Sequence, residues 1–273
     1  MSSRQGHWRD SVAEVALLYG ERGAQTFTQA YGGRTDLSPA EALRLFRMQP
    51  TQVSTRFFRE PNLWVFAARV AGGLLQQLGV PELVIGDQAS SNGMEARSLA
   101  AMLTAHKVPF RIHAFDVSPL AIDTARQNEY PGRLEEIASR LGRSGAEQYL
   151  HPYFEQSGGV VRAKPILEER ITFGVHDLLE GPPPGPKRHV QIAENVLWHL
   201  PASTGSRDRM LGNIVGNLVA GGAFMFEGLN GNSRQGENYA QWVDGLAENH
   251  GLQPVAAAGE RWAEQIRVYQ PQG

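Results

Sequence analysis

The spacing of hydrophobic and polar positions changes about eighty residues along the chain. Before Gly79, apolar residues recur at helical intervals in 12–19 and in 61–78. Between them, Ser38-Pro39-Ala40-Glu41 has the form of a capping box with proline at the first helical position, and Pro50 ends the helix it opens. The first part of the chain is therefore predicted to be helical.

After Gly79, short apolar runs alternate with amphipathic helical stretches. The predicted strands are 83–85, 110–115, 171–175, 190–193 and 223–226, and the predicted helices are 95–106, 118–125, 207–219 and 239–249. This alternation predicts βαβ units and a mostly parallel sheet. Two extended runs, 252–256 and 265–270, close the chain and predict a terminal antiparallel hairpin.

Composition narrows the class of protein. The chain has 273 residues, a net charge of -2 and no cysteine, which excludes disulfides, thiolate metal sites and a cysteine nucleophile. There is no basic stripe for nucleic acid, no apolar stretch approaching the roughly 20 residues of a membrane helix, and no signal-peptide pattern. We expect a cytoplasmic protein that acts on a small molecule, without nucleic-acid or membrane partners; the oligomeric state stays open.

Polar residues follow the predicted strands in sequence order. They are Asp87, Asp116, Asp177 and the pair Glu194-Asn195. In open α/β sheets, ligands bind beyond the carboxyl ends of the strands. Asp116 ends the second strand, where a carboxylate can accept both hydroxyls of a ribose; its alternative role is to cap the following helix, although Ser118 suits that position better.

The segment after the first strand, Asp87 to Glu95, has a single glycine, Gly93, and lacks the GxGxxG that allows close approach to a pyrophosphate. This argues against NAD, FAD and ATP. Small polar residues followed by a carboxylate suit a phosphate-free cationic ligand, such as S-adenosylmethionine (SAM). The chain also lacks metal-ligand spacing among its eight histidines and the GxSxG of serine hydrolases.

Several segments together resemble the chemotaxis receptor methyltransferases of CheR type, over about residues 50 to 230. Thr55-Arg56-Phe57-Phe58-Arg59 resembles T-x-F-F-R, and 91–98 resembles S-T-G-E-E-P-Y-S. The other matching segments are 114–118 with Ala125-Arg126 and Tyr130, Tyr153-Phe154, 173–179 (F-x-x-x-N-L-L), 193–200 (C-R-N-V-L-I-Y-F) and 220–223 with Gly228. Each motif is weak by itself, and their common order carries the resemblance.

The resemblance implies a class I, Rossmann-like SAM-dependent methyltransferase fold with a small N-terminal helical lid. Residues 1–75 would form the lid and 76–273 the SAM-binding domain. The cofactor site it implies comprises Thr55, Arg59, Asp87, Gly93, Glu95, Asp116, Val117, Asp177, Leu178, Glu194 and Asn195. Catalysis would involve Arg59, Asn195 and His199.

Within that site, Glu95 would hold the methionine amine, Asp116 the ribose and Asp177 the adenine amino group. Thr55 and Arg59 would close over the methionine end, while Asn195 and His199 would face the sulfonium. Aromatic faces at Phe57, Phe58, Tyr153 and Trp198 are candidates for cation–π contact with it. The alternatives are an exposed cation for Arg59, a turn residue for Asn195 and a satisfied core or surface residue for His199.

The chain also departs from the family pattern. Glu194 stands where the family has Arg, and His199 where it has Tyr. The segment corresponding to the basic receptor-docking helix has only three arginines within 1–30, and no tract resembles the small receptor-binding β-subdomain. These departures make receptor glutamate methylation a secondary hypothesis.

The first hypothesis is SN2 methyl transfer to a small molecule in secondary metabolism. A second is intramolecular cyclisation of SAM itself to azetidine-2-carboxylate and methylthioadenosine, which needs no acceptor surface. Protein glutamate O-methylation as in CheR-type enzymes and a non-catalytic sensor of SAM or S-adenosylhomocysteine complete the alternatives.

Overall fold

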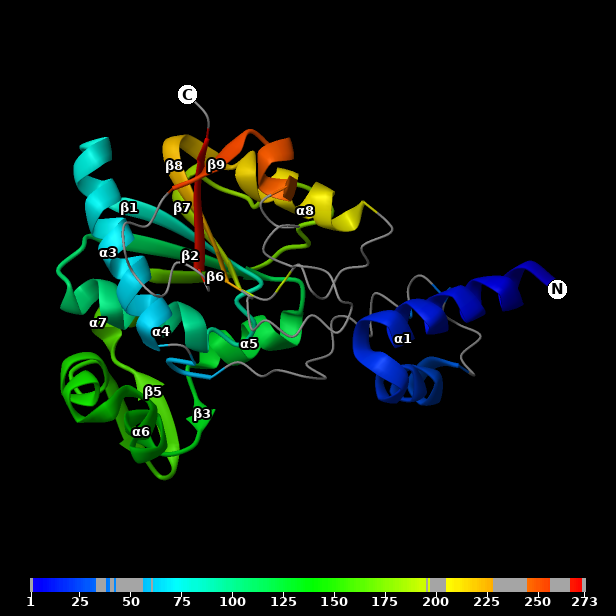
Figure 1. Ribbon diagram of the computed structural model, residues 1–273. Helices are drawn as coiled ribbons and strands as arrows, with labels where there is room; N and C mark the ends of the chain where they lie inside the picture. The colour runs from blue at the N-terminus through cyan, green and yellow to red at the C-terminus, as the bar shows by residue number, and fades with distance from the viewer. Residues whose placement is uncertain are drawn as a thin grey trace.

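The computed structural model shows an α/β fold (Figure 1) and describes residues 2–32, 38–39, 42, 56–59, 61–194, 196, 205–227, 245–255 and 266–271. Its elements are α1 Ser2–Tyr31, α3 Pro61–Leu78, β1 Leu83–Gln88, α4 Met94–Ala105, β2 Phe110–Asp116, α5 Pro119–Gln127, β3 Tyr130–Pro131, α6 Leu134–Gly145, the π-helical turn η1 Ala146–Leu150, β4 Phe154–Ser157, β5 Val160–Ala163, α7 Pro165–Glu168, β6 Ile171–Val175, β7 Arg188–Glu194, α8 Ser206–Val215, β8 Leu218–Glu227, β9 Leu252–Pro254 and β10 Ile266–Pro271.

The central sheet has seven strands in the order β6-β2-β1-β7-β8-β10-β9. The first five run parallel, while β10 is antiparallel to both β8 and β9. The predicted parallel strands and the terminal hairpin are thus confirmed. β10 inserts between β8 and β9, so that the hairpin forms one edge of the sheet.

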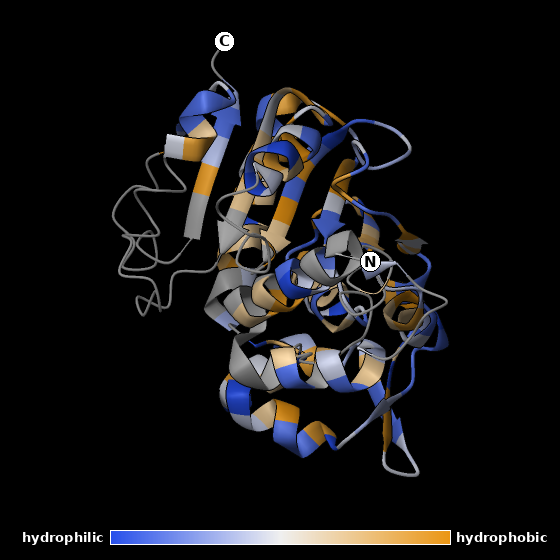
Figure 2. Cartoon of the chain, turned by 90° about the vertical axis from the view of Figure 1, so that its right-hand side faces the viewer, coloured by the Kyte–Doolittle hydropathy of each residue, from blue (hydrophilic) through white to orange (hydrophobic). Residues whose placement is uncertain are grey.

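Alternating residues of the strands supply two apolar layers. Ile192, Met225 and Val268 face one layer, with α3 and α4, whereas their neighbours Ala193 and Phe224 face the other, with α8. This period of two is what a strand buried on both faces requires. Figure 2 shows hydrophobic segments, in orange, recurring along the strands of the central sheet.

Helix α5 begins as its sequence indicates. The Ser118 hydroxyl accepts a hydrogen bond from the Ala121 N–H at 3.2 Å, and Pro119 occupies the first helical turn. Because the Ser118 hydroxyl caps the helix, the Asp116 carboxylate is not needed as its N-cap. Asp116 accepts from the Ser118 backbone N–H at 2.8 Å, which fixes its carboxylate beside the helix start.

A small antiparallel sheet, β3-β5-β4, lies between β2 and β6 in the sequence. Figure 1 shows it beside α6, below the central sheet. No tract of the sequence resembled the small receptor-binding β-subdomain, yet the structure has a small sheet here. Its strands escape a pattern search because they are two to four residues long, and in β4 only Phe154 is buried while the next three residues are exposed.

Other boundaries differ from the prediction in ways that packing explains. Helix α1 extends over Ser2–Tyr31, beyond the predicted 12–19, and contributes Val15, Phe27 and Tyr31 to a separate apolar cluster. Strand β8 begins before the predicted 223–226 and runs through Gly221-Gly222, where Gly221 takes a φ of 73° at an irregularity in the β7–β8 pairing. Within the described ranges, none of the helices is long and apolar enough to cross a membrane.

Candidate SAM-binding site

Two carboxylates lie at the carboxyl ends of neighbouring parallel strands. Asp87 pairs in register with Ala114, and Asp116 pairs with Val175, so β1, β2 and β6 end at the same edge of the sheet. Asp87 is 4% exposed. Sheet topology therefore brings together Asp87 and Asp116, which are 29 positions apart in the sequence, as predicted.

The segment 89–93 crosses from β1 to α4 and is attached to the end of β2. The Ser90 N–H donates to the Phe115 carbonyl at 2.8 Å, and the Ser91 N–H donates to Asp116 Oδ2 at 2.8 Å. Ala89 and Ser91 adopt left-handed φ values of 59° and 52°. Such strained, hydrogen-bonded backbone is typical of a binding loop whose shape matters to its function.

Gly93 ends this loop and precedes the first turn of α4. Its φ is 78°, and a Cβ there would lie 2.6 Å from Arg97 Nη1 and 2.7 Å from Phe173 Cε1. Both the conformation and the close contacts require glycine. Gly93 thereby places Glu95 in the first turn of α4, where the N-terminal end of a helix stabilises a carboxylate.

Arg59 and Glu95 form an ion pair across this loop. Arg59 Nη2 lies 3.3 Å from Glu95 Oε1, and their side chains are 17% and 6% exposed. The alternative that Arg59 is a solvent-exposed cation is therefore wrong. The ion pair brings the T-x-F-F-R segment against the loop that was predicted to hold the methionine end.

Ser98 fixes the same segment from the next turn of α4. Its hydroxyl accepts a hydrogen bond from the Phe58 N–H at 2.8 Å and donates to the Met94 carbonyl at 2.8 Å. Phe58 has a φ of 49° and is wholly buried, with its ring 5.8 Å from that of Phe154. Phe58 thus packs in the core, and the strained turn presents Arg59 to Glu95.

Burial disfavours ionisation of the carboxyl groups at this edge of the sheet. Burial, and then repulsion by Glu95 and Asp116, raises the pKa of Asp87 well above its usual value. Burial also raises the pKa of Asp116, against the opposing effect of backbone N–H donors from Ser118, Ser91 and Val117. A bound cation would relieve the repulsion among these carboxylates.

Two buried polar atoms point to a ligand in this region. Asp87 Oδ2 and Ser90 Oγ are shielded from solvent and have no hydrogen-bond partner among the residues that the structure describes. Buried polar groups in native proteins nearly always have partners. An α-ammonium and ribose hydroxyls can donate hydrogen bonds to these oxygens, so the residues present fit SAM.

The end of β6 contributes Asp177 and Leu178. Asp177 Oδ1 accepts from the Leu179 N–H at 2.9 Å, and the His176 N–H donates to the Asp116 carbonyl at 3.0 Å, so this turn lies beside Asp116. The Leu178 side chain is buried in the apolar layer under α8. Val117 is half-buried between Asp116 and the start of α5.

Part of the predicted site falls outside the described residues. These positions are Thr55, Asn195, His199 and the aromatic candidate Trp198. Glu194 is the last residue of β7, where its backbone pairs in register with Glu227, and nothing is described of its side chain. Roles for these residues stay predictions.

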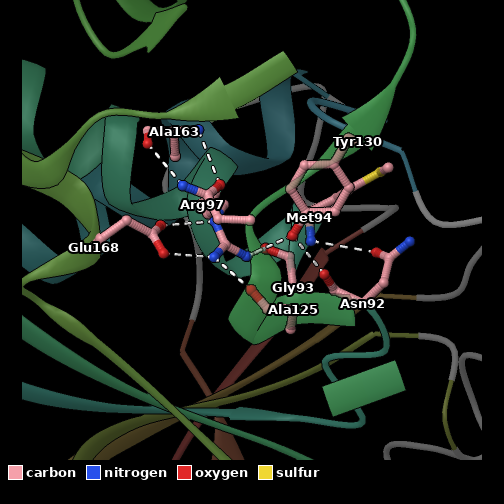
Figure 3. A network of polar contacts seen from close by, with 9 residues as sticks. Asn92, Gly93, Met94, Arg97, Ala125, Tyr130, Ala163 and Glu168 are labelled. Carbon is pink, nitrogen blue, oxygen red and sulfur yellow. Dashed lines mark hydrogen bonds and ion pairs between the residues drawn. The ribbon is translucent and has the colours of Figure 1, made fainter. Parts of the chain in front are cut away.

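Three residues next to the loop 89–93 were not predicted to support the cofactor site. Arg97, Tyr130 and Glu168 form a buried polar network behind the loop (Figure 3). Arg97 stands where the matching motif S-T-G-E-E-P-Y-S has Tyr, and arginine is ordinarily a surface residue. In the sequence, the role of Arg97 was therefore indicated only by its departure from the motif, and its burial was not expected.

A cavity of about 190 Å³ adjoins the loop on the side of the small sheet. Phe57, Met94 and Tyr130 line it near the loop, and Ile137 and Val161 continue its apolar wall. Its charged lining residues are Arg56, Arg133, Glu136 and Arg140. Three guanidinium groups against one carboxylate favour an anionic group in this cavity.

The sheet order and the carboxylates at its carboxyl edge define the class: a Rossmann-like, class I SAM-dependent methyltransferase fold. The family profile described as "CheR methyltransferase, SAM binding domain" matches residues 53–241. The chain belongs to the CheR methyltransferase family, and SAM is its cofactor.

One curated relative shares part of the sequence. It is the "Uncharacterized 104.1 kDa protein in hypE 3'region" of Rhodobacter capsulatus, 31% identical over 137 residues, which is 47% of this chain and 14% of that protein. The chain thus spans a small part of this relative's length.

Solved structures of similar fold include three methyltransferases. Magnesium protoporphyrin IX methyltransferase from Synechocystis PCC 6803, with bound SAM, is 14% identical, with 96% of this chain and 97% of that chain covered and a TM-score of 0.44. An O-methyltransferase family protein from Burkholderia thailandensis has 14% identity, 99% and 70% coverage and a TM-score of 0.46. N-methyltransferase NodS from Bradyrhizobium japonicum WM9 is 17% identical, with 78% of this chain and 99% of that chain covered and a TM-score of 0.41.

Proposed function

We propose that the chain catalyses methyl transfer from SAM to a small molecule that bears an acidic group. The observation that carries the proposal is the buried cluster of Asp87, Glu95 and Asp116 at a loop without phosphate-binding glycines, together with an arginine-lined cavity that Met94, the neighbour of Glu95, helps to line. The cluster suits a cationic donor, and the cavity suits an anionic acceptor of modest size.

In this proposal each carboxylate has a separate task. Glu95 receives the α-ammonium of the methionine arm, Asp116 the ribose hydroxyls, and Asp87 adds negative potential beneath them. Arg59 is placed, by its ion pair with Glu95, to meet the carboxylate of the same arm. SAM, when bound, supplies an electrophilic methyl group, so the protein's contribution is alignment and exclusion of water.

The acceptor would lie in the cavity of about 190 Å³. Phe57 and Tyr130, whose ring centroids lie 4.9 Å apart, give it an aromatic wall, and Met94 connects that wall to the first turn of α4. Arg133 and Arg140 lie at the α6 side and would hold an acidic group. An aromatic or aliphatic carboxylic acid matches both features.

The test is to incubate the pure protein with SAM and a panel of aromatic and aliphatic carboxylic acids, and to identify the nucleoside product by mass spectrometry. The proposal predicts S-adenosylhomocysteine that forms only with an acceptor present. Methylthioadenosine together with azetidine-2-carboxylate from SAM alone, in excess of a protein-free control, would instead establish cyclisation, and SAM binding without any of these products would contradict transfer to this class of acceptor.

A matched pair of variants assigns the acceptor cavity. Arg133→Gln removes a lining guanidinium and should raise the KM for the acid about 10-fold, the effect of one charge-assisted hydrogen bond. Arg143→Gln, on the same helix, is the control because Arg143 is 94% exposed and pairs with Glu147. Equal KM values for the two variants would exclude the cavity as the acceptor site.

A further inference from the structure

Arg97 is a fully buried cation whose partners all belong to the surroundings of the cofactor loop. It projects from α4 and is 0% exposed (Figure 3). Its Nη1 donates to the Tyr130 hydroxyl at 2.6 Å and, more weakly at 3.4 Å, to the Gly93 carbonyl. Its Nη2 donates to the Ala125 carbonyl at 2.7 Å, near the C-terminus of α5.

Glu168 compensates the charge of Arg97. Arg97 Nε and Nη2 lie 2.7 Å and 2.6 Å from the two oxygens of the Glu168 carboxylate, a two-pronged ion pair. Glu168 is the last residue of α7, which follows the small sheet in the sequence. A buried guanidinium without such a partner would be strongly destabilising, so Glu168 fixes where the guanidinium lies.

Tyr130 carries the network from Arg97 to the loop. Its hydroxyl accepts from Arg97 and donates to the Asn92 carbonyl at 2.6 Å. Burial raises the pKa of Tyr130 to about 12, so this hydroxyl keeps its proton at neutral pH. The ring centroids of Tyr130 and Phe173 also lie 5.4 Å and 4.8 Å from the guanidinium carbon, within the range of cation–π contact.

The network therefore ends on two consecutive carbonyls of the loop, those of Asn92 and Gly93. Ser91 precedes them and its N–H donates to Asp116, while Glu95, two residues after Gly93, pairs with Arg59. Because Ser91 is held in a left-handed conformation, the loop has no intrinsic preference for this shape and needs external support.

We propose that Arg97, held by Glu168 and acting through Tyr130, is a positioning residue for the SAM site. It fixes the carbonyls of Asn92 and Gly93 from behind, and thereby sets the Ser91 N–H and the Glu95 carboxylate in their binding positions. The proposal rests on the SAM site assigned above and is independent of which acceptor is used.

The experiment compares Tyr130→Phe with Tyr149→Phe. Each removes the phenolic hydroxyl of a tyrosine that is at most 8% exposed. The Tyr149 hydroxyl, in η1, lies 3.3 Å from Nε2 of His106, which follows the C-terminal end of α4, whereas the loop precedes the N-terminal end of that helix. Calorimetric titration with SAM should show an affinity about 10-fold weaker for Tyr130→Phe, the effect of one lost hydrogen bond. Tyr149→Phe should keep wild-type affinity.

A second readout separates positioning from general stability. Amide hydrogen exchange of the peptide covering 89–96 should accelerate in Tyr130→Phe and stay unchanged in Tyr149→Phe, at a temperature where both are folded. Glu168→Gln, which keeps the shape but loses the charge, should weaken SAM binding in the same direction. Arg97→Lys should also weaken SAM binding, because an ammonium cannot make the two-pronged contact with Glu168.

The inference fails if Tyr130→Phe binds SAM as tightly as the wild type, or if both tyrosine variants lose affinity equally. It also fails if exchange of 89–96 is the same in both. Absence of SAM binding by the wild-type protein would instead overturn the SAM site itself, so the two failures are distinguishable.

Discussion

At the scale of single residues, Asp87 is the most informative titratable group of the site. It is buried at the end of β1, faces Glu95 and Asp116, and has a pKa well above its usual value. Burial shifts its equilibrium toward the neutral form, whereas a cationic ligand shifts it toward the ionised form. Ligand binding and proton release at Asp87 are therefore coupled.

This coupling predicts the pH dependence of SAM binding. Affinity should rise as the pH increases through the raised pKa of Asp87, because less work is then needed to ionise the carboxyl. Calorimetric titrations across about pH 5 to 9 measure this slope, which linkage limits to about tenfold per pH unit for one proton. Asp87→Asn should weaken binding at high pH and flatten the profile.

The matched control is Asp123→Asn, because the Asp123 side chain is 62% exposed on α5. It should reproduce the wild-type profile. The stability of the protein without ligand should change with pH in the opposite direction to the affinity. Because the pKa of Asp87 is higher in the folded than in the unfolded chain, Asp87 contributes stability at pH values below its unfolded-state pKa. This contribution is lost as the pH rises through its folded-state pKa. An identical profile in the wild type and Asp87→Asn would contradict this role.

At the scale of elements, the turn between β1 and α4 depends on Gly93. Gly93→Ala should lower the free energy of unfolding by about 1–3 kcal/mol and weaken SAM binding at least tenfold, because the left-handed conformation and the contacts with Arg97 and Phe173 both resist a Cβ. Chemical denaturation and SAM titration measure the two effects.

Gly158→Ala separates strain from contact. Gly158 also has a positive φ, 60°, in the turn between β4 and β5, but a Cβ there meets nothing within 4 Å. It should lose stability through strain alone and keep SAM affinity. If Gly158→Ala impaired SAM binding as much as Gly93→Ala, the special role of the loop would be wrong.

Some helices and strands could be predicted from the sequence more accurately than others. The strands predicted at 83–85, 110–115 and 171–175 correspond to β1, β2 and β6, because apolar runs fill the buried positions of the sheet, and the polar residues after the first two runs identified Asp87 and Asp116. The strands at 130–131 and 154–157 were not, because they are short and mostly exposed. Long helix α1 was underestimated because its apolar positions are sparse.

Some residues of the candidate site could be predicted from the sequence, and others could not. Carboxylates at strand ends follow from topology, and Glu95 follows from its place after Gly93. The network behind the loop does not, because the burial of Arg97 depends on Glu168, which is 71 positions further along the chain. No local pattern encodes a pairing between residues so far apart.

At the scale of the whole molecule, two features of the fold converge on one edge. The parallel sheet brings Asp87 and Asp116 together, and the insertion between β2 and β6 supplies both Glu168 and part of the cavity lining. Cofactor binding and the acceptor cavity are thus connected through one segment of chain. The small sheet is part of this arrangement, so its removal would affect both.

The most direct test of the account is calorimetric titration of SAM into the wild-type protein and into Asp116→Ala, with circular dichroism to verify that both are folded. The account predicts one SAM bound per wild-type chain, and affinity reduced at least 100-fold in Asp116→Ala, the equivalent of about 2.7 kcal/mol. Equal affinity of the two folded proteins, or no binding by the wild type, would contradict it.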